Sequence, residues 1–355
     1  MKPLNNSRNY GIDALRLFAI YLIVTYHVIT HGGFASVTGN YQLVRLLLFT
    51  VTFCAVDCFA IISGFVGYTE EEKPYHFHKY ISMWLQVFCY SFIITLIASF
   101  FDDSITKKDI FLSAFPVLTD EFWYFTAYTP LFFLIPWVNK LIRACTKKEL
   151  TVFVCILLSV FSVFSFVTDS FRILRGYSFV WLTVLYIVGA WIKKCDIASK
   201  FKTWIAWLAL IFSILFTWFA RAYLPEWTRA PALLTYSSPT MACAAICFVT
   251  IFSKMKPNGF FKRTIAFAAP TSFGIYIFHC QDVVWTLLIV NRFTRFADLP
   301  LWVFPFAILG ASLVIFLISM IADKLRELLF KLLRIDRGAK KLCDAIAKKA
   351  VEKTE

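Results

Sequence analysis

The chain has 355 residues, of which 59% are hydrophobic and only 16% are charged, and its mean hydropathy is +0.70. A soluble domain of this length could not bury so much apolar surface, so the composition excludes a soluble globular protein and indicates an integral membrane protein. The net charge of +14 has a sufficient source in basic cytoplasmic loops, and without a nucleic-acid-binding motif we expect no nucleic acid partner.

The first apolar segment, residues 10–31, is long enough to cross a bilayer and yet contains Arg16 and His27. Its length and its arginine distinguish it from a cleaved signal peptide. The eleven-residue step between the two side chains corresponds to a rotation of about 20° and a rise of about 16 Å on a helix, so both lie on one stripe. A central arginine costs about 2.5–3.5 kcal/mol in a membrane and usually faces a cavity. This stripe is therefore the first candidate for a functional site.

Apolar runs of about 20 residues recur along the whole chain and predict an all-α, polytopic helical bundle with about ten transmembrane helices. The expected spans are 12–31, 43–68, 81–101, 122–144, 150–168, 176–192, 203–223, 236–253, 265–290 and 301–322. With the N-terminus inside, the inner segments hold 26 of the 36 Lys and Arg residues and the outer segments hold 8. This distribution follows the positive-inside rule and predicts that both termini are cytoplasmic.

After the last span, Leu325, Leu328, Leu329 and Leu332 recur at helical spacing among basic residues. This pattern predicts an amphipathic helix on the anionic inner leaflet. We therefore divide the chain into a membrane domain, residues 1–323, and a basic cytoplasmic tail, residues 324–355. The ten cysteines are scattered, mostly in apolar runs. The pairs Cys54/Cys58 and Cys243/Cys247 have i,i+4 spacing but no histidine in their own segments, so we expect packing thiols and no metal.

Four sequence elements, in this order, resemble the membrane acyltransferase-3 family. They are Arg16 with His27 in the first span, Asp57 with Ser63-Gly64-Phe65 in the second, Trp123-Tyr124 at the start of a proline-containing fourth span, and Gly274, Tyr276 and His279 in the ninth. The surrounding sequence is most similar to bacterial surface-polysaccharide O-acetyltransferases. The resemblance covers essentially the whole chain.

This resemblance implies an enzyme of the bacterial plasma membrane and cell envelope, a multi-pass acyltransferase that transfers groups other than aminoacyl groups. Its donor would be acetyl-CoA, used as a co-substrate, and its acceptor a hydroxyl of a surface glycan or a lipid-linked sugar. The expected partners are these two substrates and membrane lipid, and self-association into a homo-oligomer stays open. The identity of the acceptor sugar and of the acyl chain also stays open. So does the choice between an acyl-enzyme intermediate and direct transfer from donor to acceptor.

Arg16 and Asp13 are the candidate residues for binding the donor. A planar guanidinium suits the phosphates of acetyl-CoA, and Asp13, three residues earlier, can pair with Arg16 and fix its rotamer. The alternative is an ion pair that reaches out to the membrane interface.

His27 is the candidate catalytic base, because a neutral imidazole can take the proton of an acceptor hydroxyl or form an acyl-imidazole. A buried structural histidine is the alternative. Asp57, near the centre of the second span, would either orient His27 or make a structural hydrogen bond. His27 and Asp57 are therefore the two candidate catalytic residues.

Further polar and aromatic side chains would form a wall of the substrate channel. They are Ser63, Trp123, Tyr124, Ser272, Tyr276 and His279. Interhelical hydrogen bonds and interfacial anchoring explain the same residues equally well. A non-enzymatic transporter or flippase for a polysaccharide precursor is the rival function, although neither an inverted repeat nor a repeated pair of broken spans is visible.

Overall fold

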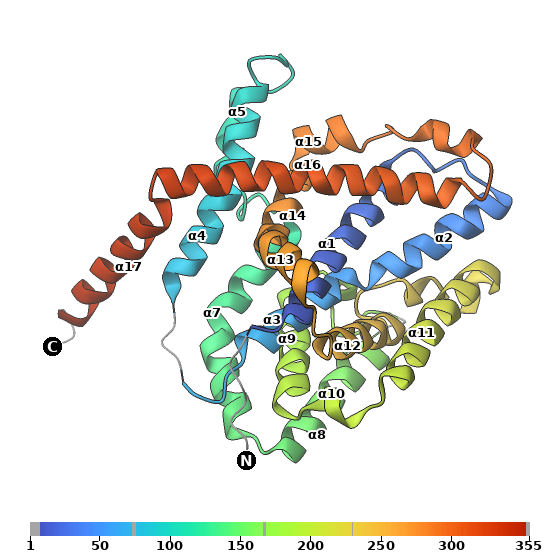
Figure 1. Cartoon of the computed structure of the whole chain (residues 1–355), viewed down its shortest axis with the longest axis horizontal. Coiled ribbons are helices and arrows are strands. Elements are labelled where there is room, and N and C mark those ends of the chain that lie inside the picture. The colour runs from blue at the N-terminus through green and yellow to red at the C-terminus, as the bar shows by residue number, and fades with distance from the viewer. Residues whose placement is uncertain (1–7, 73–75, 166–167, 229, 353–355) are drawn as a thin grey trace.

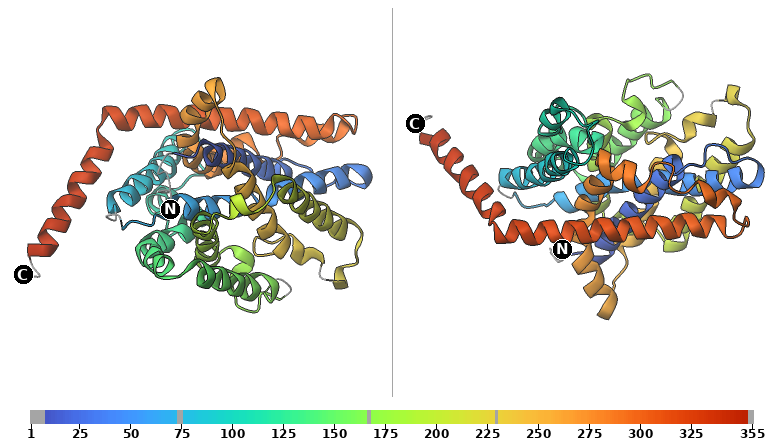
Figure 2. Two further views of the ribbon diagram at one scale, coloured as in Figure 1. Left: turned by 60° about the horizontal axis from the view of Figure 1, so that its bottom comes forward. Right: turned by 90° about the horizontal axis from the view of Figure 1, so that it is seen from above.

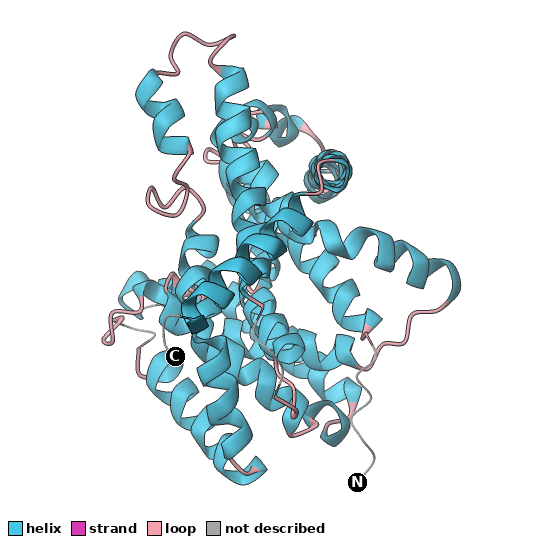
Figure 3. Cartoon of the chain, turned by 90° about the vertical axis from the view of Figure 1, so that its left-hand side faces the viewer, coloured by secondary structure: helices cyan, strands magenta, loops and turns pink. Residues whose placement is uncertain are grey.

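The computed structural model describes residues 8–72, 76–165, 168–228 and 230–352, and these form helices and connecting loops without a strand (Figure 3). The helices are α1 (Tyr10–His31), α2 (Gly39–Phe53), α3 (Ala55–Gly67), α4 (Phe77–Phe88), α5 (Ile94–Ala98), α6 (Lys107–Ser113), α7 (Trp123–Ala144), α8 (Lys147–Leu158), α9 (Phe179–Lys194), α10 (Ile197–Lys200), α11 (Thr203–Tyr223), α12 (Pro239–Ser253), α13 (Gly259–Ala268), α14 (Ser272–Cys280), α15 (Asp282–Leu288), α16 (Phe304–Leu332) and α17 (Ile335–Glu352). The predicted all-α class is confirmed.

Five helical segments of the described chain are long and apolar enough to cross a membrane. They are Tyr10–His31, Gly39–Gly67, Phe77–Ala98, Thr203–Tyr223 and Phe304–Leu332. The other expected spans coincide with helices that are shorter, less apolar or interrupted, so the number ten and the position of the termini stay predictions.

The expected ninth span, 265–290, is a chain of short helices, α13, α14 and α15, rather than one helix. Pro270 has no backbone N–H, and it lies in the 3₁₀ turn between α13 and α14. The side chain of Gln281 then accepts hydrogen bonds from Val283 N and Val284 N, which starts α15. These two residues set the ends of α14.

α1 lies at the centre of the bundle, where it packs against α2, α3, α12, α14 and α16 (Figure 1). Asn9 caps its N-terminus by accepting hydrogen bonds from Gly11 N and Ile12 N, and its own amide donates to the Ser253 carbonyl of α12. No residue of α1 before His31 is exposed, which suits a helix that carries Arg16 and His27.

α3 and α9 cross with their backbones in contact. A Cβ atom on Gly64 would lie 1.8 Å from the Tyr186 carbonyl oxygen, and one on Gly189 would lie 1.9 Å from the Ile61 carbonyl oxygen. Small residues permit this close approach between membrane helices. The crossing holds α3, which carries Asp57 and Ser63, at a fixed height beside α1.

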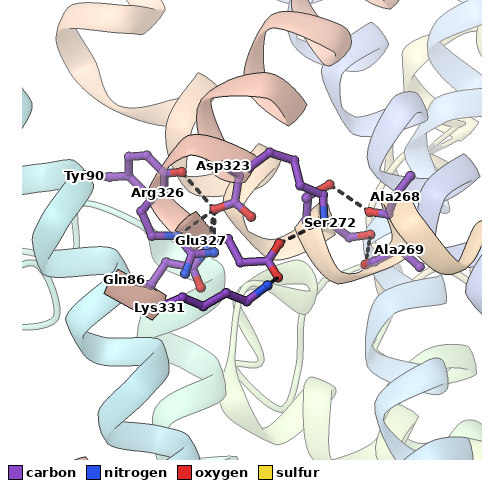
Figure 4. Close-up of polar contacts among 11 residues, drawn as sticks. Gln86, Tyr90, Ala268, Ala269, Ser272, Asp323, Arg326, Glu327 and Lys331 are labelled. Carbon is purple, nitrogen blue, oxygen red and sulfur yellow. Dashed lines mark hydrogen bonds and ion pairs between the residues drawn. The ribbon is translucent and has the colours of Figure 1, made fainter. Parts of the chain in front are cut away.

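α16 spans one side of the molecule, and α17 turns away from its end (Figures 1 and 2). Near that end a polar cluster attaches α16 to its neighbours: Asp323 Oδ1 accepts hydrogen bonds from Gln86 (2.9 Å) on α4, from Tyr90 (2.8 Å) and from Arg326 (Figure 4). Gly274 of α14 makes room for this carboxylate, since a Cβ there would lie 2.0 Å from it. The boundary expected between residues 323 and 324 therefore falls inside a continuous helix that is packed against the bundle.

Candidate active site

One cavity of ≈ 390 Å³ runs along the α1 stripe, and both Arg16 and His27 line it. Its volume lies within the usual range of small-molecule sites, about 300–1,000 Å³. Five more of the predicted site residues contribute to its wall, namely Ser63, Trp123, Tyr124, Ser272 and Tyr276. The other lining residues come from α2, α3, α4, α7, the loop before α12, the 3₁₀ turn that precedes α14, and α14 itself. All of these segments thus meet at α1, the helix that the sequence singled out.

Arg16 marks one end of the cavity and is held by Asp13. Its Nη1 lies 3.3 Å from Asp13 Oδ1, and the same carboxylate accepts a 2.5 Å hydrogen bond from Arg8 Nε. Asp13 is buried, whereas Arg8 is half-exposed. The pair predicted from the i,i+3 spacing is therefore formed, and Arg8 adds a second guanidinium that the sequence reasoning did not include.

His27 is paired with His279 of α14. His27 Nδ1 lies 2.9 Å from His279 Nε2, and His279 Nδ1 lies 2.5 Å from the Ile275 carbonyl oxygen. A carbonyl oxygen only accepts, so His279 carries its proton on Nδ1 and its Nε2 is the acceptor for His27 Nδ1–H. In these neutral tautomers, Nε2 of His27 bears a lone pair. That nitrogen can take a proton.

Cys280 lies beside this pair and brings a third atom of metal-ligand type. The three ligand atoms of His27, His279 and Cys280 lie within 4.8 Å of one another. The separation of 2.9 Å between the two ring nitrogens is a hydrogen-bond distance, and two nitrogens bound to zinc at about 2.0–2.1 Å with tetrahedral angles would lie farther apart. The arrangement fits a histidine relay better than a metal site.

Asp57 is fully buried but does not meet His27 in the described contacts. Its Oδ1 accepts a 3.1 Å hydrogen bond from the Trp181 indole of α9. Of the two roles that the sequence left open for Asp57, the geometry favours the structural hydrogen bond, and His279 occupies the place beside His27.

Ser63 lines the cavity one helix away from His27. Its Oγ donates its only proton to the Phe59 carbonyl, 3.0 Å away. A hydroxyl that donates to the preceding turn of its own helix in this way is not a free nucleophile.

Ser272 and Tyr276 form the α14 wall. Ser272 Oγ donates to the Ala269 carbonyl at 2.8 Å, so it contributes to the fold at the α13–α14 break (Figure 4). The Tyr276 ring lies 6.2 Å from the Tyr124 ring and 6.5 Å from the His279 ring. Tyr276 thus links the wall formed by α7 to the histidine relay.

The loop that precedes α7 carries Glu121, a carboxyl group with a raised pKa. Burial raises the pKa of Glu121 to about 7, although Ser91 donates a hydrogen bond to its Oε2, which favours the ionised form. Glu121 lies two residues before Trp123, which lines the cavity.

A protein-family profile described as an acyltransferase domain matches residues 9–322. No curated protein and no solved structure matches the chain. The profile includes α1 with both stripe residues, the α7 wall and α14 with His279, and it ends one residue before Asp323.

Proposed function

The chain belongs to the acyltransferase-3 family of membrane acyltransferases, and from this premise we propose that it transfers an acetyl group from cytoplasmic acetyl-CoA to a hydroxyl of a cell-surface polysaccharide or of its lipid-linked precursor. The family supports the acyltransferase activity. The donor, the acceptor, the bacterial plasma membrane and the roles of individual residues are the proposal.

The observation that carries the proposal is the His27–His279–Ile275 relay next to the cavity that also contains Arg16. Base and guanidinium are on one helix, separated by a rise of about 16 Å. This separation lets one extended acyl-CoA arm place its phosphates near Arg16 and its thioester near His27.

In the proposed reaction, His27 Nε2 removes the proton from the acceptor hydroxyl while that oxygen attacks the thioester carbonyl carbon. A C–O bond forms, the C–S bond breaks, and the CoA thiolate takes up the proton that His27 received. His279 Nε2 accepts from His27 Nδ1–H throughout and stabilises the imidazolium that forms transiently. No acyl-enzyme is needed.

Arg16 binds the phosphates of the donor by charge-assisted hydrogen bonds. Asp13 orients its guanidinium, and Arg8 on the other carboxylate oxygen of Asp13 keeps the local charge positive. We assign both predicted donor residues to this end of the cavity.

The test is to incubate membranes that contain the protein with radiolabelled acetyl-CoA and to measure label in the polysaccharide fraction. We expect His27→Ala to lower the transfer rate by at least about 100-fold, the usual contribution of a general base. His76→Ala is the matched control, because His76 is exposed at the start of α4 and should leave transfer unchanged.

Wild-type transfer by a correctly inserted His27→Ala variant would refute the role of His27. Movement of a polysaccharide precursor across the membrane without any label would favour the transporter instead.

A further inference from the structure

Three aromatic rings from distant parts of the chain meet at the end of the cavity that is remote from Arg16. Trp123, at the first residue of α7, lies 4.5 Å from Tyr177 and 5.6 Å from Tyr236 between ring centroids, and the two tyrosine rings are 4.8 Å apart. We call these three residues the aromatic platform. Tyr177 is 40% exposed, whereas Tyr236 is 4% exposed, so the platform extends from the surface into the protein.

The row of rings continues from the platform to the catalytic histidine. Tyr236 stacks on Phe53 at 4.8 Å, Phe53 lies 5.7 Å from Tyr26, and Tyr26 lies 5.3 Å from His27. All of these rings except Tyr177 line the cavity. The platform therefore provides an aromatic path between the exposed surface and the proposed base.

The loop that presents Tyr177 is fixed against Tyr236. Gly176 adopts φ +99, and a Cβ at this position would lie 2.5 Å from Tyr236 Cβ. Ser237 N also donates to the Arg175 carbonyl at 3.4 Å. This packing holds the platform in one geometry, as a binding surface requires.

The chemical character of these rings differs from that of the outer surface. The most exposed aromatic side chains on the described helix surfaces are mainly phenylalanines, such as Phe111, Phe260 and Phe306, which suit lipid. Tyrosine and tryptophan instead combine an apolar face with a hydrogen-bonding edge, and five tyrosines line the cavity. Among the described lining residues, Arg16 is the one Lys, Arg, Asp or Glu.

A pyranose ring has the same two-sided character, with an apolar C–H face and hydroxyl groups around its edge. Its C–H face packs on an aromatic ring, and its hydroxyls reach tyrosine O–H groups. We propose that the aromatic platform binds a sugar ring of the acceptor, so that the glycan enters at Tyr177 and presents a hydroxyl at His27. This proposal rests on the function proposed above and names the site at which its acceptor binds.

The test measures initial rates of acetyl transfer with chemically de-O-acetylated surface polysaccharide of the producing cells as the varied substrate. We expect Tyr177→Ala to raise the apparent KM for the polysaccharide about tenfold, because one stacking contact contributes about 1.4 kcal/mol. The KM for acetyl-CoA should stay within about twofold of wild type. Tyr177→Phe keeps the ring and should recover most of the affinity.

Tyr223→Ala is the matched control, since Tyr223 is an exposed tyrosine at the end of α11 outside the cavity lining, and it should leave both KM values unchanged. An unchanged polysaccharide KM in Tyr177→Ala, or a change confined to acetyl-CoA, would overturn the platform while the acetyl transfer itself stands.

A second measurement separates the two proposals. Binding of the same polysaccharide to the detergent-purified protein without acetyl-CoA is followed by tryptophan fluorescence. Binding that is lost in Tyr177→Ala supports the platform even if the wild type transfers no acetyl group, which would refute only the proposed function. Equal binding by wild type and Tyr177→Ala, or none by either, overturns the platform.

Discussion

His279 is held from both sides, by the Ile275 carbonyl at Nδ1 and by His27 at Nε2. The backbone carbonyl four residues earlier on α14 thus decides which nitrogen of His279 accepts, and His279 in turn decides which nitrogen of His27 carries the lone pair. His279 is fully buried and is a positioning residue in this scheme, since it acts through His27.

This role predicts different effects for two substitutions of His279. Glutamine offers an amide oxygen that can accept from His27 Nδ1–H, whereas alanine removes the acceptor. We expect His279→Ala to lower kcat by about 100-fold and His279→Gln to recover at least a tenfold part of that loss. The KM for acetyl-CoA should be unchanged in both. Equal losses in the two variants, at equal amounts of folded protein, would mean that His279 serves only packing.

The sequence predicted the residues of this site within one helix better than their partners on other helices. The period of α1 is sufficient to place Arg16 and His27 on one stripe, and both line the cavity. The sequence left open whether Asp57 orients His27 or makes a structural hydrogen bond, and it did not pair His27 with His279. This pair joins residues 252 positions apart, and the periodicity of a single helix carries no information about such a contact. Tyr26 and Tyr177 were not selected because aromatic residues are common throughout the chain.

At the scale of single helices, apolar length predicts where helices occur and much less well where they end. The expected 265–290 span contains Pro270 and Gln281, and these end one helix and begin another. A hydropathy average does not distinguish such interruptions from a continuous span. The break matters for function because it creates the short α14 that carries His279.

The close contact between α3 and α9 predicts that adding a single methyl group at the crossing destabilises the protein. Gly64→Ala or Gly189→Ala inserts a methyl group where a carbonyl oxygen of the facing helix lies within 2 Å. We expect each substitution to destabilise the protein by about 1–3 kcal/mol, read as a lower Tm in detergent, together with loss of transfer activity.

Gly310→Ala on α16 is the control for this prediction, because a Cβ there meets nothing within 4 Å. It should raise the Tm slightly, as alanine is the better helix former. A Tm for Gly64→Ala and Gly189→Ala equal to that of the wild type would show that the two helices do not touch through their glycines.

At the scale of the whole molecule, two counts of the membrane crossings predict opposite positions for the C-terminus. If only the five long apolar segments cross, the number is odd and the termini lie on opposite sides. If ten spans cross, the shorter helices such as α9 and α12 also pass through the membrane, and both termini lie on one side. The excess of Lys and Arg in the inner segments of the ten-span arrangement favours the second alternative.

Fusions at two positions decide between these arrangements. We expect a fluorescent-protein fusion after Glu355 to be bright and an alkaline-phosphatase fusion there to be inactive, because the tail from Lys324 onward contains ten Lys and Arg residues that resist translocation. Phosphatase inserted after Asp103, in the loop between α5 and α6, should be active and serves as the outer control. An active C-terminal phosphatase with an inactive one at Asp103 would reverse the orientation, and would place Arg16 on the side that lacks acetyl-CoA. Activity at both positions would instead mean an even number of crossings after that loop, as in the arrangement with five long segments.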